Sequence, residues 1–335
     1  MKKKYDEFSS NRERNRFISK KSKTVTNTVR EHFIPWEETN GTVLEIYPKF
    51  CKVRFDVDHL DRLCTYRRAQ VWQKRNEDDR SKTPMTVGDR VKAKIFGSKD
   101  GLIEGVAQRK NEISRPAAGR EGNISQVIAA NIDCLVIVAS LHDPDFSPGF
   151  IDRFLIAAIR STIPTLLCIN KADLKSSDQD QPWKIYQDLG FECLLTSAKS
   201  KLGLEDLKQR ILGKTVVFCG NSGVGKTSLL NVLIESYSGK VGDVNTVTGK
   251  GKHTTTSAKL LDGPSDSAWI DTPGIRNFSM RHLDEKELKS FFPEFDALAC
   301  TQKNCLHEHE TDCDAKNLVR YPSYLKILET IRQGF

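Results

Sequence analysis

The stretch that most constrains this chain is a glycine-rich loop, which reads Gly-Asn-Ser-Gly-Val-Gly-Lys-Thr at 220–227. It fits the pattern G-x-x-x-x-G-K-[ST], follows the apolar run 215–219 and opens the helix-like run 228–234. Strand, tight loop and helix in this order predict a phosphate-binding loop, because backbone N–H groups and the helix N-terminus then face the phosphate oxygens. The alternative is a chance glycine turn before a helix.

Each polar position in this loop has an expected role. Lys226 is expected to reach the β- and γ-phosphates, and the Thr227 hydroxyl is expected to bind Mg²⁺. The residues predicted to hold the triphosphate are Gly220, Asn221, Ser222, Gly223, Val224, Gly225, Lys226, Thr227 and Ser228.

A second motif, Asn-Lys-Ala-Asp at 170–173, indicates which base is bound. A carboxylate accepts two hydrogen bonds, so Asp173 can take the guanine ring N–H and its exocyclic amine, a pair that adenine does not offer. The Lys171 stem can lie along the purine, and Asn170 can tie this segment to the phosphate loop. A surface turn is the alternative. The nearby Ser197-Ala198-Lys199 follows another apolar run, and backbone N–H groups there can meet the guanine carbonyl, which favours GTP.

Two further segments complete a GTPase set, in an unusual order. Asp271 begins Asp-Thr-Pro-Gly and is expected to hold Mg²⁺ through water, while the Gly274 N–H senses the γ-phosphate. The glycine- and threonine-rich stretch 249–256 suits a switch in which Thr255, with Thr254 as the rival, closes on Mg²⁺. Small GTPases ordinarily run from the phosphate loop to N-K-x-D, and here N-K-x-D comes first. The sequence therefore predicts a circular permutation of an α/β phosphate-loop GTPase domain, which is tolerated where the original termini lie close together.

Composition narrows the class of protein and its partners. The 335 residues contain no long uncharged apolar stretch, so we expect no membrane span, and nine cysteines without an export signal favour the reducing cytoplasm. Residues 1–30 hold ten Lys and Arg against three Asp and Glu, within a net charge of +8. This basic excess at the N-terminal end is typical of nucleic-acid partners, with ordinary solubilising charge as the alternative.

The N-terminal third divides into a basic arm and a barrel. No apolar period holds residues 1–35 together, which predicts a disordered or partly helical arm, inert or bound to RNA phosphates. Five short alternating segments between residues 41 and 106 predict an OB-type β-barrel. Tyr66 is a candidate base-stacking platform beside basic residues, although aromatics in small barrels are more often core.

A cysteine and histidine cluster near the C-terminus predicts a metal site. Cys300, Cys305, His307 and Cys313 lie within fourteen residues, and three thiolates with one imidazole suit a structural, tetrahedral Zn²⁺. His309 is a possible alternative ligand. The alternative without a metal site is three free thiols near a histidine that lies there by chance.

The motif order, together with Gly-Lys-His-Thr-Thr-Thr at 251–256, Asp-Thr-Pro-Gly-Ile-Arg at 271–276 and the cysteine cluster, resembles the RsgA (YjeQ) family over about residues 40–330. The resemblance implies an N-terminal OB-fold, a circularly permuted GTPase domain and a helical zinc-binding region, in which the family spacing selects His307. It also implies GTP hydrolysis in late maturation of the small (30S) ribosomal subunit, rRNA binding and release after hydrolysis. We expect a monomer divided into 1–37, 38–117, 118–282 and 283–335.

The sequence lacks one familiar catalytic group. Ras-like enzymes place a water-orienting glutamine after D-x-x-G, and here that position is Ile275. We therefore expect slow unassisted hydrolysis and name His253, which the resemblance also favours, as the candidate that aligns water, alongside Lys226 and Thr255. The alternative functions are a GTPase acting on mature ribosomes or another structured RNA, and a non-catalytic RNA-binding adaptor that uses GTP structurally.

Overall fold

The computed structural model describes nine segments of the chain, which are 33–67, 85–116, 125–174, 181–238, 258–271, 283–296, 298, 305–308 and 313–333. Most of the predicted basic arm, and the basic stretch around Trp72, lie outside these segments. In the part of the chain that is described, no helix is both long and apolar enough to cross a bilayer.

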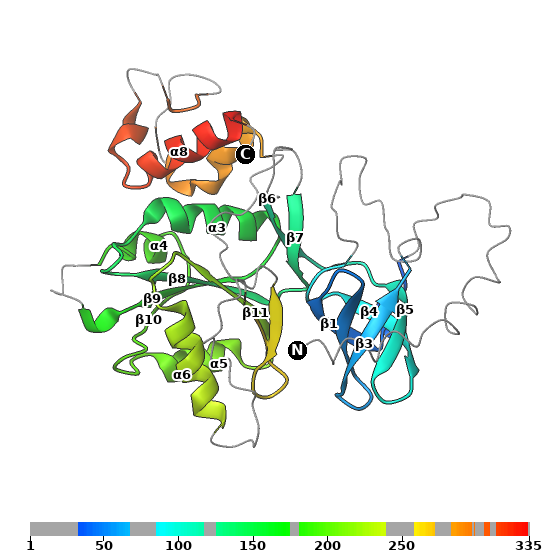
Figure 1. The fold of residues 1–335 in the computed structure, drawn as a ribbon. Coiled ribbons are helices and arrows are strands. Elements are labelled where there is room, and N and C mark those ends of the chain that lie inside the picture. Colours follow the sequence, from blue (N-terminus) through cyan, green and yellow to red (C-terminus); the bar gives the residue numbers. More distant parts are fainter. Residues whose placement is uncertain are drawn as a thin grey trace. The chain divides into compact units, whose positions relative to one another are not determined.

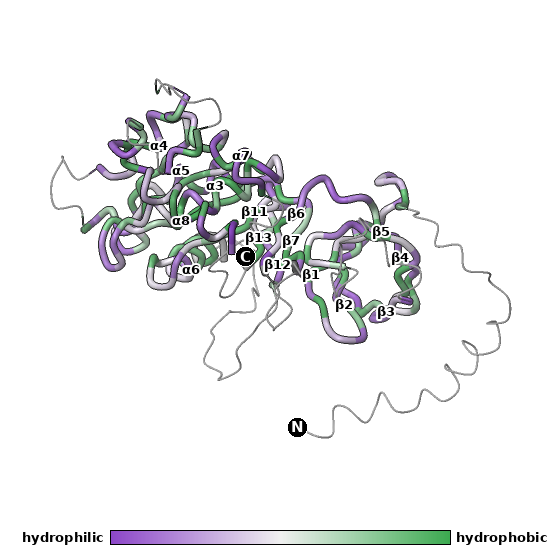
Figure 2. The backbone as a smooth tube through the Cα atoms, turned by 90° about the horizontal axis from the view of Figure 1, so that it is seen from above, coloured by the Kyte–Doolittle hydropathy of each residue, from purple (hydrophilic) through white to green (hydrophobic). Residues whose placement is uncertain are grey.

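The predicted five-stranded barrel is confirmed. Its strands run in the closed order β1-β2-β3-β5-β4, and their bounds are β1 Gly41–Ile46, β2 Phe50–Phe55, β3 Asp61–Tyr66, β4 Arg90–Phe96 and β5 Asp100–Val106. Hydrophobic and hydrophilic residues are interspersed along these strands (Figure 2), and Val43, Phe55 and Ile103 are fully buried in the barrel core. Tyr66 packs half-buried against this barrel core, which favours the core interpretation of that ring.

The connection at 109–131 contains a sheet of its own that the sequence did not indicate. Strand β6, Glu112–Pro116, pairs antiparallel with β7, Ser125–Ala130. The base of this sheet is fixed by Arg109, whose Nε lies 2.5 Å from Asp89 Oδ1 while its Nη1 lies 2.7 Å from Glu112 Oε2. Asp89 is fully buried and Arg109 nearly so, so the pair anchors the exit from the barrel.

A six-stranded sheet carries the nucleotide motifs (Figure 1), in the order β10-β9-β8-β11-β13-β12. Neighbouring strands are parallel throughout, except that β12 runs antiparallel to β13. The bounds are β8 Cys134–Ser140, β9 Thr165–Asn170, β10 Cys193–Leu195, β11 Thr215–Gly220, β12 Lys259–Asp262 and β13 Ala268–Asp271. Nearly continuous apolar runs form the central strands because both faces of the sheet are covered.

Helices cover the two faces of this sheet. Helices α3, Pro148–Arg160, and α4, Lys184–Asp188, contribute to one core with Phe154 and Tyr186. Helices α5, Leu204–Ile211, and α6, Lys226–Ser238, contribute to the other core with Leu207 and Leu233. The helix-like run 228–234 lies inside α6, as expected.

The C-terminal region is a separate small core of short helices. They are α7 Glu285–Leu288, η4 Lys289–Phe291, η5 Pro293–Phe295, η6 Asp314–Asn317 and α8 Tyr321–Arg332. The helical turns of residues 285–291 are divided between α7 and the 3₁₀ turn η4, and Pro293 then opens the next turn. Phe292, Phe295 and Tyr324 pack together and against Ile156 of α3, so this core rests on the GTPase sheet's own helix.

Candidate nucleotide site and metal cluster

The two motifs predicted to bind phosphate and guanine lie at the same edge of the sheet. Gly220 at the end of β11 is paired with Val138 of β8, and Asn170 at the end of β9 is paired with Ser140 of the same strand. The carboxyl ends of parallel strands meet at one edge, where ligands of open α/β sheets bind. Segments 50 residues apart in sequence therefore form one candidate site.

The phosphate loop has the backbone that its glycines predict. Gly225 has φ of +92°, a conformation that favours glycine, and a Cβ there would lie 2.3 Å from Asn170 Nδ2. Lys226 begins α6, and its Nζ donates to the Gly220 and Asn221 carbonyls at 2.5 and 2.8 Å. The ammonium thus lies at the loop that the helix N-terminus faces, while the side chains of Thr227 and Ser228 are exposed.

Asn170 joins the two motifs, as the sequence led us to expect. Its Nδ2 donates to the Val224 carbonyl at 2.8 Å, and its Oδ1 accepts from the Ala198 N–H at 3.3 Å. The Thr196 hydroxyl lies 3.4 Å from the same Oδ1. Because Asn170 is only 1% exposed, these bonds form in a dry environment and fix the spacing between the loops.

Asp173 is held in position by its neighbour across the site. It lies in the 3₁₀ turn η3, Ala172–Leu174, and its Oδ1 accepts from the Ser197 hydroxyl at 2.6 Å. Ser197 in turn accepts from the Ser200 N–H at 3.0 Å. Asp173 itself is exposed, so its carboxylate remains accessible to a base while one oxygen is oriented by the protein.

A segment that sequence reasoning missed lies beside both loops. Lys171 donates to the Asp143 carbonyl, and a Cβ on Gly223 would lie 3.4 Å from Pro144 Cδ. Ser140 fixes this segment by donating to the Pro144 carbonyl at 2.6 Å. No nucleotide motif covers residues 141–147, and the only available signal was their place immediately after a buried strand.

The remaining predicted site residues are described only in part. The backbone of Asp271 ends β13, beside Phe218 of β11 and two residues short of the phosphate loop in register. His253, Thr254, Thr255, Gly274 and Ile275 lie outside the described residues, as do Cys300 and His309.

Three of the predicted metal ligands converge in the C-terminal core. The ligand atoms of Cys305, His307 and Cys313 all lie within 4.8 Å of one another, so the cluster can hold a metal ion. His307 Nδ1 lies 3.4 Å from Cys305 Sγ and 3.1 Å from Cys313 Sγ. Ordinary zinc bond lengths place tetrahedral nitrogen and sulfur ligands about 3.6 Å apart, so the donor set fits that ion.

The surroundings of the cluster support its geometry. His307 is fully buried against the edge of Phe295, with 4.7 Å between ring centroids. Its backbone N–H donates to Cys305 Sγ at 3.3 Å, a bond that favours a sulfur bearing negative charge. The Tyr324 hydroxyl donates to the Leu306 carbonyl at 2.7 Å, which anchors the cluster to α8.

Comparison with known proteins agrees with this architecture. The family described as RsgA GTPase matches residues 106–281. A Bacteroides thetaiotaomicron protein, "Small ribosomal subunit biogenesis GTPase RsgA 2", is 35% identical over 76% of this chain and 86% of its own length. A Haemophilus influenzae protein named "Small ribosomal subunit biogenesis GTPase RsgA" is 36% identical over 76% of this chain and 78% of its own length.

Two solved structures are similar along nearly the whole chain. YjeQ from Thermotoga maritima is 29% identical, with a TM-score of 0.64 over 87% of this chain and 98% of its own. YloQ, a protein described as a circularly permuted GTPase, is 26% identical, with a TM-score of 0.60 over 92% of this chain and 98% of its own. The matched region spans both nucleotide motifs in their permuted order. The chain therefore belongs to the RsgA family of circularly permuted GTPases.

Proposed function

We propose that this protein hydrolyses GTP as an assembly factor of the small ribosomal subunit, on which it acts in late maturation before hydrolysis releases it. The observation that carries the proposal is its 33–36% identity to proteins named for small ribosomal subunit biogenesis, over 76% of this chain. We further infer that it works as a monomer in the cytoplasm, with the arm, barrel, GTPase domain and zinc region bounded as the sequence suggests.

GTP would be held by the two loops joined through Asn170. In this proposal residues 220–228 receive the phosphates, Asp173 reads guanine, and Ser197 and Ala198 lie against the base. Mg²⁺ would be held by Thr227, Thr255 and Asp271, and the Gly274 N–H would contact the γ-phosphate. The support is the shared sheet edge and the 2.8 Å bond from Asn170 to Val224.

Hydrolysis would depend on a group other than the missing glutamine. We infer that His253 aligns the attacking water once the ribosomal partner orders its segment, while Lys226 and Thr255 stabilise the transferred phosphate. A His253→Ala protein is expected to bind GTP normally and to lose about a hundredfold or more of its subunit-stimulated turnover. Unchanged stimulated turnover would exclude this role.

Zn²⁺ would complete the C-terminal core. Cys300 is proposed as the fourth ligand, joining Cys305, His307 and Cys313, and a closed set of four protein ligands is typical of a structural site. The ion would cross-link a segment whose apolar core is small.

The barrel offers a face suited to single-stranded rRNA. Strand register aligns Lys52, Leu63 and Phe96 across its outer side, around Asp100. Phe96 is 48% exposed, and Lys94 Nζ lies 5.7 Å from its ring centroid. An exposed ring beside cations can stack a base while the cations bind phosphates, so we infer that this face contacts rRNA.

Co-sedimentation with purified ribosomal subunits tests the proposal. We expect the protein to pellet with small subunits in the presence of a non-hydrolysable GTP analogue and to dissociate from them in the presence of GDP. It should not pellet with large subunits. Lys94→Glu should weaken this binding without altering GTP affinity. Equal binding to both subunits would favour a general RNA-dependent GTPase. Binding that is the same with the GTP analogue and with GDP would favour the non-catalytic RNA-binding adaptor.

A further inference from the structure

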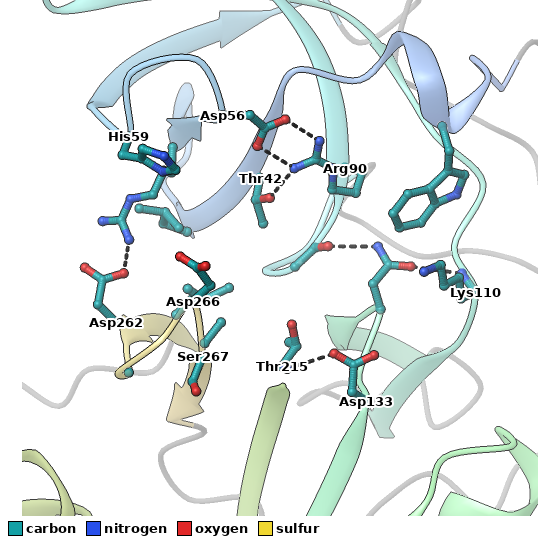
Figure 3. Close-up of a pocket in the computed structure, with 18 residues that line it drawn as sticks. Thr42, Asp56, His59, Arg90, Lys110, Asp133, Thr215, Asp262, Asp266 and Ser267 are labelled. Atoms are coloured by element: carbon teal, nitrogen blue, oxygen red, sulfur yellow. Dashed lines mark hydrogen bonds and ion pairs between the residues drawn. The ribbon is translucent and has the colours of Figure 1, made fainter. Parts of the chain in front are cut away.

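The β12–β13 hairpin meets the barrel across a polar cleft. The cleft has a volume of about 680 Å³ and is lined on the barrel side by Arg54, Asp56 and Arg90 and on the hairpin side by Asp262 and Asp266. Figure 3 shows Asp56 and Arg90 on the barrel side of this cleft and Asp262 and Asp266 on the hairpin side. The barrel core and the two sheet cores are separate apolar clusters, so polar contacts carry much of this junction.

Two ion pairs join the hairpin to the barrel. Lys259 Nζ of β12 lies 2.8 Å from Glu45 Oε1 of β1. At the other end of the same strand, Asp262 pairs with Arg54 of β2, as the dashed line in Figure 3 marks. The Glu45 side chain is only 16% exposed, which limits screening of its pair by solvent. Each end of β12 thus carries an ion pair to the barrel, although the side chains of Lys259 and Asp262 are 42% and 60% exposed.

The register of the sheet leads from these pairs to the nucleotide site. Lys259 lies directly opposite Asp271 in the β12–β13 ladder, and Asp271 lies beside Phe218 in the β13–β11 ladder. Only Cys219 lies between Phe218 and Gly220, the first residue of the phosphate loop. Only Lys259 therefore lies between the barrel carboxylate of Glu45 and Asp271, the proposed Mg²⁺ ligand at the end of β13.

The β12–β13 hairpin is held together by the hydrogen bonds of its turn and by packing of β13 against β11. Its turn is closed by bonds from Gly263 N–H to the Ser267 carbonyl at 2.8 Å and from Ser267 N–H to the Pro264 carbonyl at 3.0 Å. Trp269 of β13 is 1% exposed and meets the edge of Phe218. A displacement of β12 relative to the barrel is consequently passed to the end of β13 rather than absorbed in the turn.

We propose that Glu45 and Lys259 are positioning residues for Mg²⁺, through which the barrel controls the metal side of the GTPase site. This inference rests on the proposed role of Asp271. Binding of rRNA to the barrel would shift β1, and the Glu45–Lys259 ion pair would transmit this shift to β12. Because β12 pairs with β13, Asp271 would then move toward or away from the metal. Coupling is reciprocal, so Mg²⁺–GTP would bias the barrel equally.

Charge reversal and its rescue test the proposal in the full-length protein. Glu45→Lys or Lys259→Glu places like charges opposite each other, so the Mg²⁺ concentration for half-maximal binding of a fluorescent GTP analogue, measured without turnover, should rise about threefold to fivefold, and the midpoint for GTP hydrolysis should rise with it. The double variant Glu45→Lys/Lys259→Glu restores an opposite-charge pair and should return this midpoint to within about twofold of wild type. A general loss of stability would not be repaired in this way.

Two further variants make the outcome unambiguous. Glu205→Lys with Lys208→Glu reverses an ion pair of 3.1 Å on α5, and should leave the Mg²⁺ midpoint unchanged. Asp271→Asn should raise the midpoint more than either barrel variant. If Asp271→Asn has no effect, the proposed role of Asp271 fails. If Asp271→Asn acts but Glu45→Lys does not, or the double variant is no better than the singles, the positioning role of the barrel is wrong.

Discussion

At the scale of single residues, Gly225 shows why the phosphate loop tolerates no side chain. Its φ of +92° and the 2.3 Å approach of Asn170 Nδ2 leave no space for a methyl group. Gly225→Ala should therefore displace the loop and misalign its N–H donors, lowering GTP affinity by about tenfold or more, since each bond to a charged group contributes about 1.5–3 kcal/mol. Titration with a fluorescent GTP analogue measures this loss.

A matched glycine separates backbone strain from the loss of the site. Gly190 has a similar φ of +86°, but no atom lies within 4 Å of a Cβ built there. Gly190→Ala should cost about 1 kcal/mol of unfolding free energy and leave GTP affinity unchanged. Equal GTP affinity in Gly225→Ala and Gly190→Ala would contradict the geometry described for the loop.

The base preference is a property of one carboxylate. Asp173→Asn replaces an acceptor with an amide donor, which suits xanthine, whose carbonyl stands where guanine has its amine. We expect GTP affinity to fall about a hundredfold, because two bonds to a charged acceptor are lost, and XTP affinity to rise.

Ser197→Ala removes only the 2.6 Å bond that orients Asp173, and should lower GTP affinity about tenfold or less without any gain in XTP affinity. Competition binding with both nucleotides distinguishes these results, and an unchanged preference in Asp173→Asn would remove Asp173 from the base site.

At the scale of secondary-structure elements, the strand cysteines and the metal-cluster cysteines should react differently. Burial raises the pKa of Cys134 to about 11 and that of Cys168 to about 12, so both stay protonated at pH 8. Iodoacetamide at pH 8 should spare them in the folded protein, with or without a chelator. Cys305 and Cys313 should become alkylated only after metal is removed, as peptide mass spectrometry would show. Their labelling in untreated, folded protein would contradict a resident metal.

The elements differ in how well the sequence predicted them. Buried parallel strands such as Cys134–Ser140 are continuous apolar runs that hydropathy alone identifies, and the barrel strand Phe50–Phe55 alternates clearly. Strand β12, Lys-Leu-Leu-Asp, is too short and too charged at its ends to stand out, and its ion pairs with the barrel are set by the tertiary structure. Helix α5 did carry a readable signal, because Leu204, Leu207 and Ile211 follow helical spacing.

The candidate site was predictable where a motif fixes local geometry. The bond from Asn170 to Val224 joins two motifs that the sequence placed at one nucleotide site, although 54 residues separate them. The contact of Asp143 with Lys171 follows from no motif, since a carbonyl group can belong to any residue type. The pairing of Arg320 with Asp152 joins positions 168 residues apart and was likewise not predictable from the sequence.

At the scale of the whole molecule, Arg320 connects the C-terminal core to the GTPase sheet. Its side chain is 1% exposed and lies 2.9 Å from both Asp152 of α3 and Glu294 of η5. Arg320→Ala would leave the buried carboxylate of Asp152 and the partly buried one of Glu294 without their cation, and breaking a buried pair typically costs about 3–5 kcal/mol. Urea denaturation at pH 7 should report a loss of this size, and a loss below about 1 kcal/mol would contradict the connecting role.

The same variant should have a distinct pH dependence. Burial raises the pKa of Asp152 and of Glu294, and the Arg320 charge opposes that rise. Without Arg320 both pKa values rise further, so the folded state binds protons that the unfolded state has released, and stability falls as pH rises. The destabilisation of Arg320→Ala relative to wild type should therefore be larger at pH 7 than at pH 5. A pH-independent difference would mean that the two carboxylates do not depend on Arg320.

The permuted order connects the GTPase sheet to both flanking regions of the chain. The strand that ends at Asp271 is followed in sequence by the segment leading to the C-terminal core, and its hairpin partner is fixed to the barrel. The GTPase sheet therefore has a connection to each flanking region, one through the chain and one through ion pairs. A partner that engages both regions can act on the nucleotide site from two sides.

Steady-state GTP hydrolysis by the pure protein, alone and with purified small or large ribosomal subunits, tests the central claim most directly. The account predicts slow turnover alone and strong stimulation by the small subunit only, because the side chain after Asp-x-x-Gly is apolar and the partner must complete the site. Equal stimulation by both subunits, or no turnover with either, would contradict it.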